Sequence, residues 1–332
     1  QLFLNLLSRL NLHFLYLRKL NIMKNILFTL ALLIFFVSFG QTSEEYYKMG
    51  GAKFESSDYK GAIEEYTKSI ELDSEYLVAY IDRGFSKHNL GDYTGAIADY
   101  TKAIGLVKKL ASASEHLTPD LTEYVIKQKS SLYHHRGSAK YDLKDYKDAI
   151  ADYNKAIEMN PNDWFWWYYR GVAKFRLADN TGAIADYTKA IEINPEDAQT
   201  YWRRGYSKTE LSDYTGAIAD FTKSMEVEPD YDAYYDRGLV KAELQNYKGA
   251  ISDYTKAIEI DPNYAAAYSN RGLAKDDLKD YKGAIEDFTK AIEINPNYSN
   301  AFYNRGLSKR KLKDNKGAIA DYTKAIEIDP ND

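Results

Sequence analysis

The sequence predicts an all-α solenoid in which antiparallel helix pairs stack one after another, and three observations point to this class. A glycine recurs at intervals of 34 residues, with one interval of 33 and one of 53. Aromatic residues and alanines recur around each glycine with a helical period. A proline closes six of the eight repeats. Because one such repeat cannot bury its apolar face alone, neighbouring repeats must stack. The recurring glycines are Gly50, Gly84, Gly137, Gly171, Gly205, Gly238, Gly272 and Gly306.

Each repeat begins with a helix that carries this glycine and is expected to end about six residues after it. An aromatic residue lies four positions before the glycine, which is one helical turn away. We interpret this aromatic residue as the knob of the repeat. The glycine and an alanine twelve positions later are the hollows where the two helices of the repeat approach closely. The aromatic residues are Tyr46, Tyr80, Tyr133, Trp167, Tyr201, Tyr234, Tyr268 and Phe302.

The second helix of each repeat starts after a short turn that ends in Asp or Asn. Asp92, Asp213 and Asp280 are suited to cap such a helix. This helix carries the alanine, an aromatic residue sixteen positions after the glycine and a small residue at nineteen. It is expected to stop before an Asn-Pro or Asp-Pro pair, because proline biases the preceding residue away from helical geometry. The repeats run near 43–76, 77–110, 130–163, 164–197, 198–230, 231–264, 265–298 and 299–332.

This order of aromatic, glycine, alanine, aromatic, small residue and proline resembles the tetratricopeptide repeat, and the resemblance covers residues 43–332. It implies a right-handed superhelix whose first helices line a concave groove for peptides or partner proteins. The chain departs from the family pattern in two ways. Arginine precedes the glycine in seven repeats, where the family usually has leucine, and lysine follows three positions after it in all eight.

Residue types that recur in nearly every repeat are expected to hold the stack together. The arginine and the lysine lie four positions apart on one helix face, as Arg271 and Lys275 do, and an acid lies fifteen positions after each glycine. We interpret them as a network of ion pairs between paired helices, each exposed and of little weight. The alternative is a basic track for an acidic ligand, which requires these residues to face the groove.

Six consecutive aromatic residues, from Trp164 to Tyr169, break this regularity. Each residue advances about 100° around a helix. Trp167 therefore shares the side of the recurring glycine and belongs to the framework. Trp166 lies between the two sides and is expected to touch a neighbouring first helix.

Phe165, Tyr168 and Tyr169 fall on the opposite side, where the resemblance places the groove. Matching positions in neighbouring repeats extend them into one surface, and such aromatic residues are enriched at binding hot spots. We predict that this surface binds the ligand; the alternative is that its residues only stack on one another. In some relatives a row of asparagines holds a peptide backbone, and only two residues match it here. The predicted site residues are His135, Phe165, Tyr168, Tyr169, Trp202, Arg203, Tyr206, Tyr235, Asn270 and Asn304.

The interval of 53 residues contains an insertion of nineteen, within 107–129. Thr118 and Pro119 have the character of an N-cap and a first helical residue. The simplest account lengthens the second helix of one repeat and the first helix of the next. The insertion is expected to be a spacer, or else a projecting hairpin that contacts a partner.

The sequence contains no catalytic motif and no cysteine. Its carboxylates are accounted for by helix caps and repeated ion pairs, and we expect no cofactor, metal or catalytic residue. His134 and His135 diverge by about 100°, which disfavours a joint metal site. The favoured function is a non-catalytic scaffold that binds a protein or peptide. The alternative is the regulatory or targeting portion of a longer protein, such as an enzyme, of which this chain is a truncated piece.

The N-terminal segment predicts export. Residues 23–40 have a charged start at Lys24, a stretch of 14 residues without charge and small residues at Ser38 and Gly40, which is typical of a cleaved signal peptide. A membrane anchor is the alternative, but a spanning helix requires about 20 apolar residues. Residues 1–22 are interpreted as translated sequence upstream of a start at Met23, or as a long n-region.

Removing residues 1–40 lowers the net charge from −5 to −9, because they carry four basic and no acidic residues. An acidic chain is a poor candidate for nucleic-acid binding. The mature domain, 41–332, is therefore expected in the periplasm or outside the cell, without nucleic acid and without membrane contact.

Overall fold

The computed structural model describes residues 24, 41–113 and 119–330. The segments 1–22 and 23–40, with the predicted signal peptide, fall almost wholly outside the described residues. Thr118 lies outside them as well. Sixteen helices and no strand lie in the described part of the chain. The helices are α2 (Ser43–Glu55), α3 (Tyr59–Leu72), α4 (Leu77–Asn89), α5 (Tyr93–Ala113), α6 (Pro119–Asp142), α7 (Tyr146–Met159), α8 (Trp164–Arg176), α9 (Asn180–Ile193), α10 (Ala198–Glu210), α11 (Tyr214–Val227), α12 (Tyr231–Glu243), α13 (Tyr247–Ile260), α14 (Ala265–Asp277), α15 (Tyr281–Ile294), α16 (Ser299–Lys311) and α17 (Asn315–Ile328).

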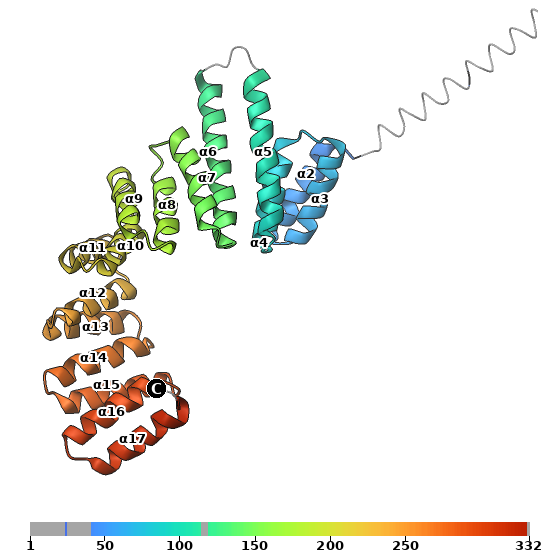
Figure 1. Cartoon of the computed structure of the whole chain (residues 1–332). Coiled ribbons are helices and arrows are strands. Elements are labelled where there is room, and N and C mark those ends of the chain that lie inside the picture. Colours follow the sequence, from blue (N-terminus) through green and yellow to red (C-terminus); the bar gives the residue numbers. More distant parts are fainter. Residues whose placement is uncertain (1–23, 25–40, 114–118, 331–332) are drawn as a thin grey trace, which may run out of the picture. The chain divides into compact units, whose positions relative to one another are not determined.

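The chain divides into two compact units, residues 1–106 and 107–332, and each is described by itself. In the first unit α2 packs against α3, and α3 against α4. In the second unit every helix from α6 to α17 packs against the next one along the chain, as α14 to α17 show (Figure 1). Successive first helices, such as α8, α10 and α12, also touch. The predicted fold class, an all-α solenoid of stacked antiparallel helix pairs, is confirmed.

The helix boundaries follow from local chemistry. Asp92, Asp213 and Asp280 each accept a hydrogen bond from the backbone N–H three residues later, at 2.9–3.0 Å, so the predicted N-caps are confirmed. The second helices of the six later repeats end one residue before the Asn, Glu or Asp that precedes the proline, as predicted. The turn between the two helices contains a residue in the left-handed region, with φ of 58–66° in seven repeats and 78° at Gly91 in the other.

The glycine of each repeat receives an aromatic ring of its own second helix. A Cβ placed on Gly171 would lie 2.7 Å from Tyr187 Cε1, and the same clash recurs in all eight repeats. The prediction that the aromatic residue four positions before the glycine is the knob in this hollow is therefore wrong. Trp167 instead lies against Arg170, whose guanidinium carbon is 4.8 Å from the ring centroid.

A buried three-residue clamp joins the helices of a repeat. Arg170 donates two hydrogen bonds to Asp186, at 2.6 and 2.9 Å, and Lys174 lies 2.8 Å from the same carboxylate. The side chain of Asp186 is only 3% exposed and that of Arg170 16%. The predicted ion-pair network is present, but the expectation that its pairs are exposed is wrong. Its cations are engaged by acids of the second helices, as Arg170 and Lys174 are by Asp186, and so they are not left free as a basic track for a ligand.

The clamp also crosses the boundary between repeats. Arg170 donates a third hydrogen bond, of 2.7 Å, to Asn154 of the preceding repeat. Five other arginines make the equivalent bond to a threonine, at 2.8–3.1 Å. One guanidinium therefore ties together three helices from two repeats.

The insertion lengthens two helices, as predicted. Helix α5 has 21 residues, where other second helices have 14, and α6 has 24 residues, where other first helices have 13. Helix α6 begins at Pro119, which agrees with the predicted start. Among the described residues, no helix is both long and apolar enough to cross a membrane.

Candidate functional site

The aromatic residues of the run 164–169 differ in their surroundings, and two of those predicted to face the groove, Tyr168 and Tyr169, pack against buried core clusters. Trp166 is buried, and its ring centroid lies 4.6 Å from that of His134 on α6, the preceding first helix. The predicted contact with a neighbouring first helix is confirmed. Trp167 donates from Nε1 to the backbone oxygen of Pro161, at 2.9 Å, and belongs to the framework. Phe165 and Tyr169 are half-buried, with centroids 4.7 Å apart.

Several predicted site residues form pairs that join one first helix to the next. Arg203 donates from Nε to the hydroxyl of Tyr168, at 3.0 Å. Trp202 donates from Nε1 to Asp236, at 2.9 Å. In the following repeat, the amide of Asn270 donates to the hydroxyl of Tyr235, at 2.7 Å.

These pairs obey one rule. The residue three positions before the glycine of one repeat meets the residue two positions before the glycine of the next. Tyr47 and Asp82 follow it in the first unit, at 2.8 Å, and the rings of His134 and Tyr169 follow it with centroids 4.8 Å apart. The first member is a tyrosine in three of these pairs, and its hydroxyl bonds to an aspartate, an arginine or an asparagine at the second position. Sequence reasoning identified the positions but not the pairing.

Four of the ten predicted residues, Phe165, Tyr206, His135 and Asn304, take no part in these pairs. His135 lies within hydrogen-bond distance of Ser131 on its own helix, at 3.0 Å. Asn304 lines a separate pocket of about 710 Å³ between α16 and α17. Neither belongs with the aromatic residues of α8 and α10.

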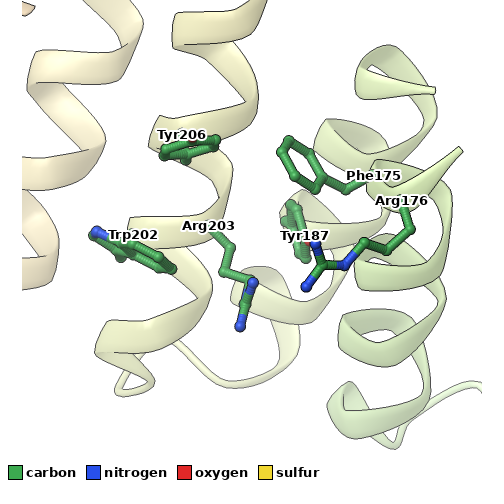
Figure 2. A pocket seen from close by; sticks show the side chains of 6 residues that line it. All are labelled: Phe175, Arg176, Tyr187, Trp202, Arg203 and Tyr206. Carbon is green, nitrogen blue, oxygen red and sulfur yellow. The ribbon is translucent and has the colours of Figure 1, made fainter. Parts of the chain in front are cut away.

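A pocket of about 240 Å³ opens between α8, α9 and α10. Trp202, Arg203 and Tyr206 of its lining were predicted as site residues, and Tyr206 is 39% exposed. Figure 2 shows Arg203 and Tyr206 on α10 beside Phe175, Arg176 and Tyr187 of the neighbouring helix pair. The prediction missed three further lining residues, which are Phe175, Arg176 and Tyr187.

Arg176 could have been found by comparing repeats. It lies five positions after its glycine, where five other repeats have an acid. The residues at this position in the other repeats are Glu55, Asn89, Asp142, Glu210, Glu243, Asp277 and Lys311. Only in two repeats, at Arg176 and Lys311, is the residue basic.

Trp202 also lines a second pocket, of about 320 Å³, whose character is the opposite. Five carboxylates line this acidic pocket, and it contains no Lys or Arg. They are Glu196, Asp197, Glu228, Asp230 and Asp232.

Asp236, the partner of Trp202, is mostly buried. The pKa of Asp236 is raised to about 6, chiefly because the carboxyl is buried; the hydrogen bond from Trp202 opposes this shift, and the charges of Asp232 and Asp230 add to it. Trp202 therefore lines two pockets of opposite character: one contains Arg176 and Arg203, and the other contains the five carboxylates.

The described residues contain no group of three or more His, Asp or Glu side chains that could hold a metal ion. Some of their carboxylates are N-caps, such as Asp179, and others are clamp acids, such as Asp186.

Comparisons with known proteins agree with the repeat pattern. Models described as "Tetratricopeptide repeat" match residues 77–107, 130–163, 167–197, 198–231, 265–298 and 299–332, and a "TPR repeat" model matches 238–275. Together these matches span more than half of the chain. No curated protein matches it in sequence.

Several solved structures are similar. A tetratricopeptide repeat protein from Parabacteroides merdae is 20% identical with a TM-score of 0.54, over 77% of this chain and 94% of that one, and it shows the fold alone. MamA is 27% identical with a TM-score of 0.47, over 48% of this chain and 94% of that one. YrrB, described as a TPR protein with an unusual peptide-binding site, is 26% identical with a TM-score of 0.48, over 54% of this chain and 93% of that one.

Proposed function

Because the chain belongs to the tetratricopeptide repeat family, we propose that it is a non-catalytic interaction scaffold that holds a protein or peptide partner against its first helices. The observation that carries this proposal is the open pocket lined by Trp202, Arg203 and Tyr206. Aromatic residues and arginine are the residue types that dominate binding energy at protein interfaces. The hydrogen bonds Trp202–Asp236 and Arg203–Tyr168 hold two of these side chains in place before a partner arrives, which lowers the entropy lost on binding.

The role of the carboxylates supports a scaffold rather than an enzyme. An acid used for general acid–base catalysis needs room for a substrate beside it. The clamp acids are enclosed by two cations each, as Asp186 is by Arg170 and Lys174. We therefore assign the protein a binding role and no reaction.

Tyr206 provides the cleanest test of this function. Replacing Phe165, Tyr169 and Trp202 together would also remove packing and the Trp202–Asp236 bond, so loss of binding would be ambiguous. The Tyr206→Ala variant removes a side chain that is 39% exposed. We expect it to reduce the recovery of peptides from a random display library while the melting temperature stays within a few degrees.

The matched control is Leu278→Ala, which removes an apolar side chain of similar exposure, 42%, at the end of α14. This control should recover peptides as the wild type does. Equal recovery by all three proteins, or no recovery by the wild type, would contradict a binding role for the pocket.

We further propose that residues 23–40 direct export and are removed after Gly40. The support is the order of charge, apolar stretch and small residues in this segment. N-terminal sequencing of the protein recovered from the cell envelope should begin at Gln41. Recovery of the uncleaved chain from the cytoplasm would contradict export.

A further inference from the structure

Arg176 and Arg203 differ from the arginines of the clamps. Each clamp arginine is paired with a buried aspartate, as Arg170 is with Asp186. Within residues 41–113 and 119–330, no carboxylate lies in ion-pair distance of Arg176 or Arg203. Both line the pocket of about 240 Å³. The pocket therefore holds two positive charges that the protein itself leaves uncompensated.

Tyrosines of the preceding repeats orient both guanidinium groups. Arg176 donates from Nε to the hydroxyl of Tyr141, at 2.9 Å, and Arg203 donates from Nε to that of Tyr168, at 3.0 Å. Each bond uses the Nε of its arginine, so the Nη atoms remain for a ligand. Figure 2 shows Arg203 entering the pocket from α10 and Arg176 from α8. Two oriented guanidinium groups suit one carboxylate or phosphate, which each can bind with charge-assisted hydrogen bonds.

An apolar surface lies beside the two charges. The rings of Phe175 and Tyr206 meet edge to face with centroids 5.6 Å apart, and the centroid of Trp202 lies 6.0 Å from that of Tyr206. The volume of about 240 Å³ is smaller than the roughly 300–1,000 Å³ of small-molecule sites. It fits one or two amino-acid side chains, of which one is anionic and the next apolar or aromatic.

We propose that this pocket binds an acidic side chain within a peptide segment of the partner, with the carboxylate between Arg176 and Arg203 and a neighbouring apolar side chain against Phe175 and Tyr206. This inference rests on the proposed scaffold function and names its partner class. The acidic pocket on the other side of Trp202 adds a condition. A second acid in the ligand near that pocket would meet like charge, so the pocket selects an isolated acid rather than an acidic run.

The test is selection from a library of random peptides displayed internally, with both ends joined to the display protein so that no free C-terminal carboxylate is offered. The full-length chain should enrich peptides with a single Asp or Glu next to a Phe, Leu or Tyr. The double variant Arg176→Gln/Arg203→Gln should lose this preference. For an individual selected peptide, the affinity should fall about tenfold or more, because the variant removes the charge-assisted hydrogen bonds to the carboxylate.

Two control variants separate charge from folding. Arg310→Gln removes an exposed arginine of α16 outside this pocket and should keep the preference. Tyr141→Phe/Tyr168→Phe keeps both charges but removes the hydroxyl groups that orient them, and it should weaken binding of the same peptide by less than the double arginine variant.

The outcomes distinguish this inference from the scaffold function. If the wild type enriches peptides that contain no acid, the scaffold function is supported and the proposal that the pocket binds an acidic side chain is wrong. If the wild type enriches no peptide, the scaffold function fails as well. Replacing the acid of a selected peptide with Gln should abolish the effect of the arginine variants. If inorganic phosphate competes at lower concentration than acetate, and a phosphoserine peptide binds more tightly than the Glu peptide, the ligand is a phosphate and the carboxylate assignment is wrong.

Discussion

Arg170 and Asp186 are joined by two parallel hydrogen bonds, of 2.6 and 2.9 Å, between α8 and α9. The aspartate is almost fully buried, and Lys174 lies on the same carboxylate at 2.8 Å. Asp186→Asn would leave two cations facing a neutral amide in a buried site. We expect the free energy of unfolding to fall by about 3–5 kcal/mol, measured by urea denaturation followed by circular dichroism.

The control for this prediction is Glu192→Gln, which breaks the pair with Lys189. Both side chains of that pair are more than half exposed, at 54% and 55%. The change should cost at most about 1 kcal/mol. If both variants lowered the free energy of unfolding equally, burial of the clamp would contribute nothing to stability.

Gly171 provides a test of the close contact between helices. An alanine there would place its Cβ 2.7 Å from the buried ring of Tyr187, so Gly171→Ala should destabilise the protein by about 1–3 kcal/mol. Gly105, within α5, has open space around its missing Cβ. Gly105→Ala should therefore stabilise by up to about 1 kcal/mol through helix propensity. Thermal melting compares the two, and a shift of the same sign for both would contradict the glycine's role in packing.

In the turn between paired helices, the residue with positive φ is an alanine in one repeat and a glycine in another, so the two can be exchanged in opposite directions. Ala178 has φ of 58° and Gly91, at the same position in another repeat, has φ of 78°. Side chains disfavour this conformation by roughly 1–2 kcal/mol. Ala178→Gly should raise the melting temperature, while Gly91→Ala should lower it although nothing lies within 4 Å of the added Cβ. A loss of stability in both variants would show that the entropy of the unfolded glycine outweighs the strain.

The raised pKa of Asp236 predicts that the stability of the folded protein depends on pH. Its pKa is raised to about 6 by burial, so the folded state holds this proton more tightly than the unfolded state. The stabilisation by protonation is present below the unfolded pKa of about 3.9 and is lost as the pH rises to about 6. Asp236→Asn keeps an acceptor for Trp202 and removes the charge.

We therefore expect Asp236→Asn to be more stable than the wild type at pH 7, by about 2–3 kcal/mol at most, and the difference to shrink as the pH falls to 4. Unfolding curves of both proteins at several pH values measure this. A difference that stays constant with pH would show that Asp236 does not titrate in this range.

Two isoleucines at one repeat position have different surroundings. Ile258 is 9% exposed and packs with Ala267 of the next first helix, whereas Ile326 on α17 is 61% exposed. Ile258→Ala should cost about 2–5 kcal/mol, and Ile326→Ala should cost well under half of that. Urea midpoints compare them, and similar losses would show that the following helix contributes little to burial.

The period of the sequence was enough to predict the helices, because a cap such as Asp213 and a proline such as Pro229 act within a few residues of themselves. It also predicted that Arg170 and Asp186 interact, since the same spacing recurs in every later repeat. How deeply the carboxylate is buried depends on the neighbouring repeat, which supplies Asn154, and spacing within one repeat carries no information about that depth.

The candidate site was predicted less completely. Helical angles placed Trp202 and Arg203 near each other on α10, where both line one pocket, but could not show which residue of a neighbouring repeat each one meets, because that depends on the stagger between first helices. The pair between Trp202 and Asp236 is one result of this stagger. Arg176 lies in the last turn of α8, one turn beyond the predicted positions, and was not predicted.

The hydrogen bond from a clamp arginine to a Thr or Asn of the preceding repeat recurs from one junction to the next. Arg237 reaches Thr222 at 2.8 Å although the spacing there is one residue shorter, whereas Arg271 reaches Thr255 at 3.0 Å across the regular spacing. This bond therefore tolerates a change of one residue in repeat length. A repeat gained or lost by recombination would keep the arginine bond at its new junction, whereas the pair between first helices, such as Trp202–Asp236, would have to be matched again.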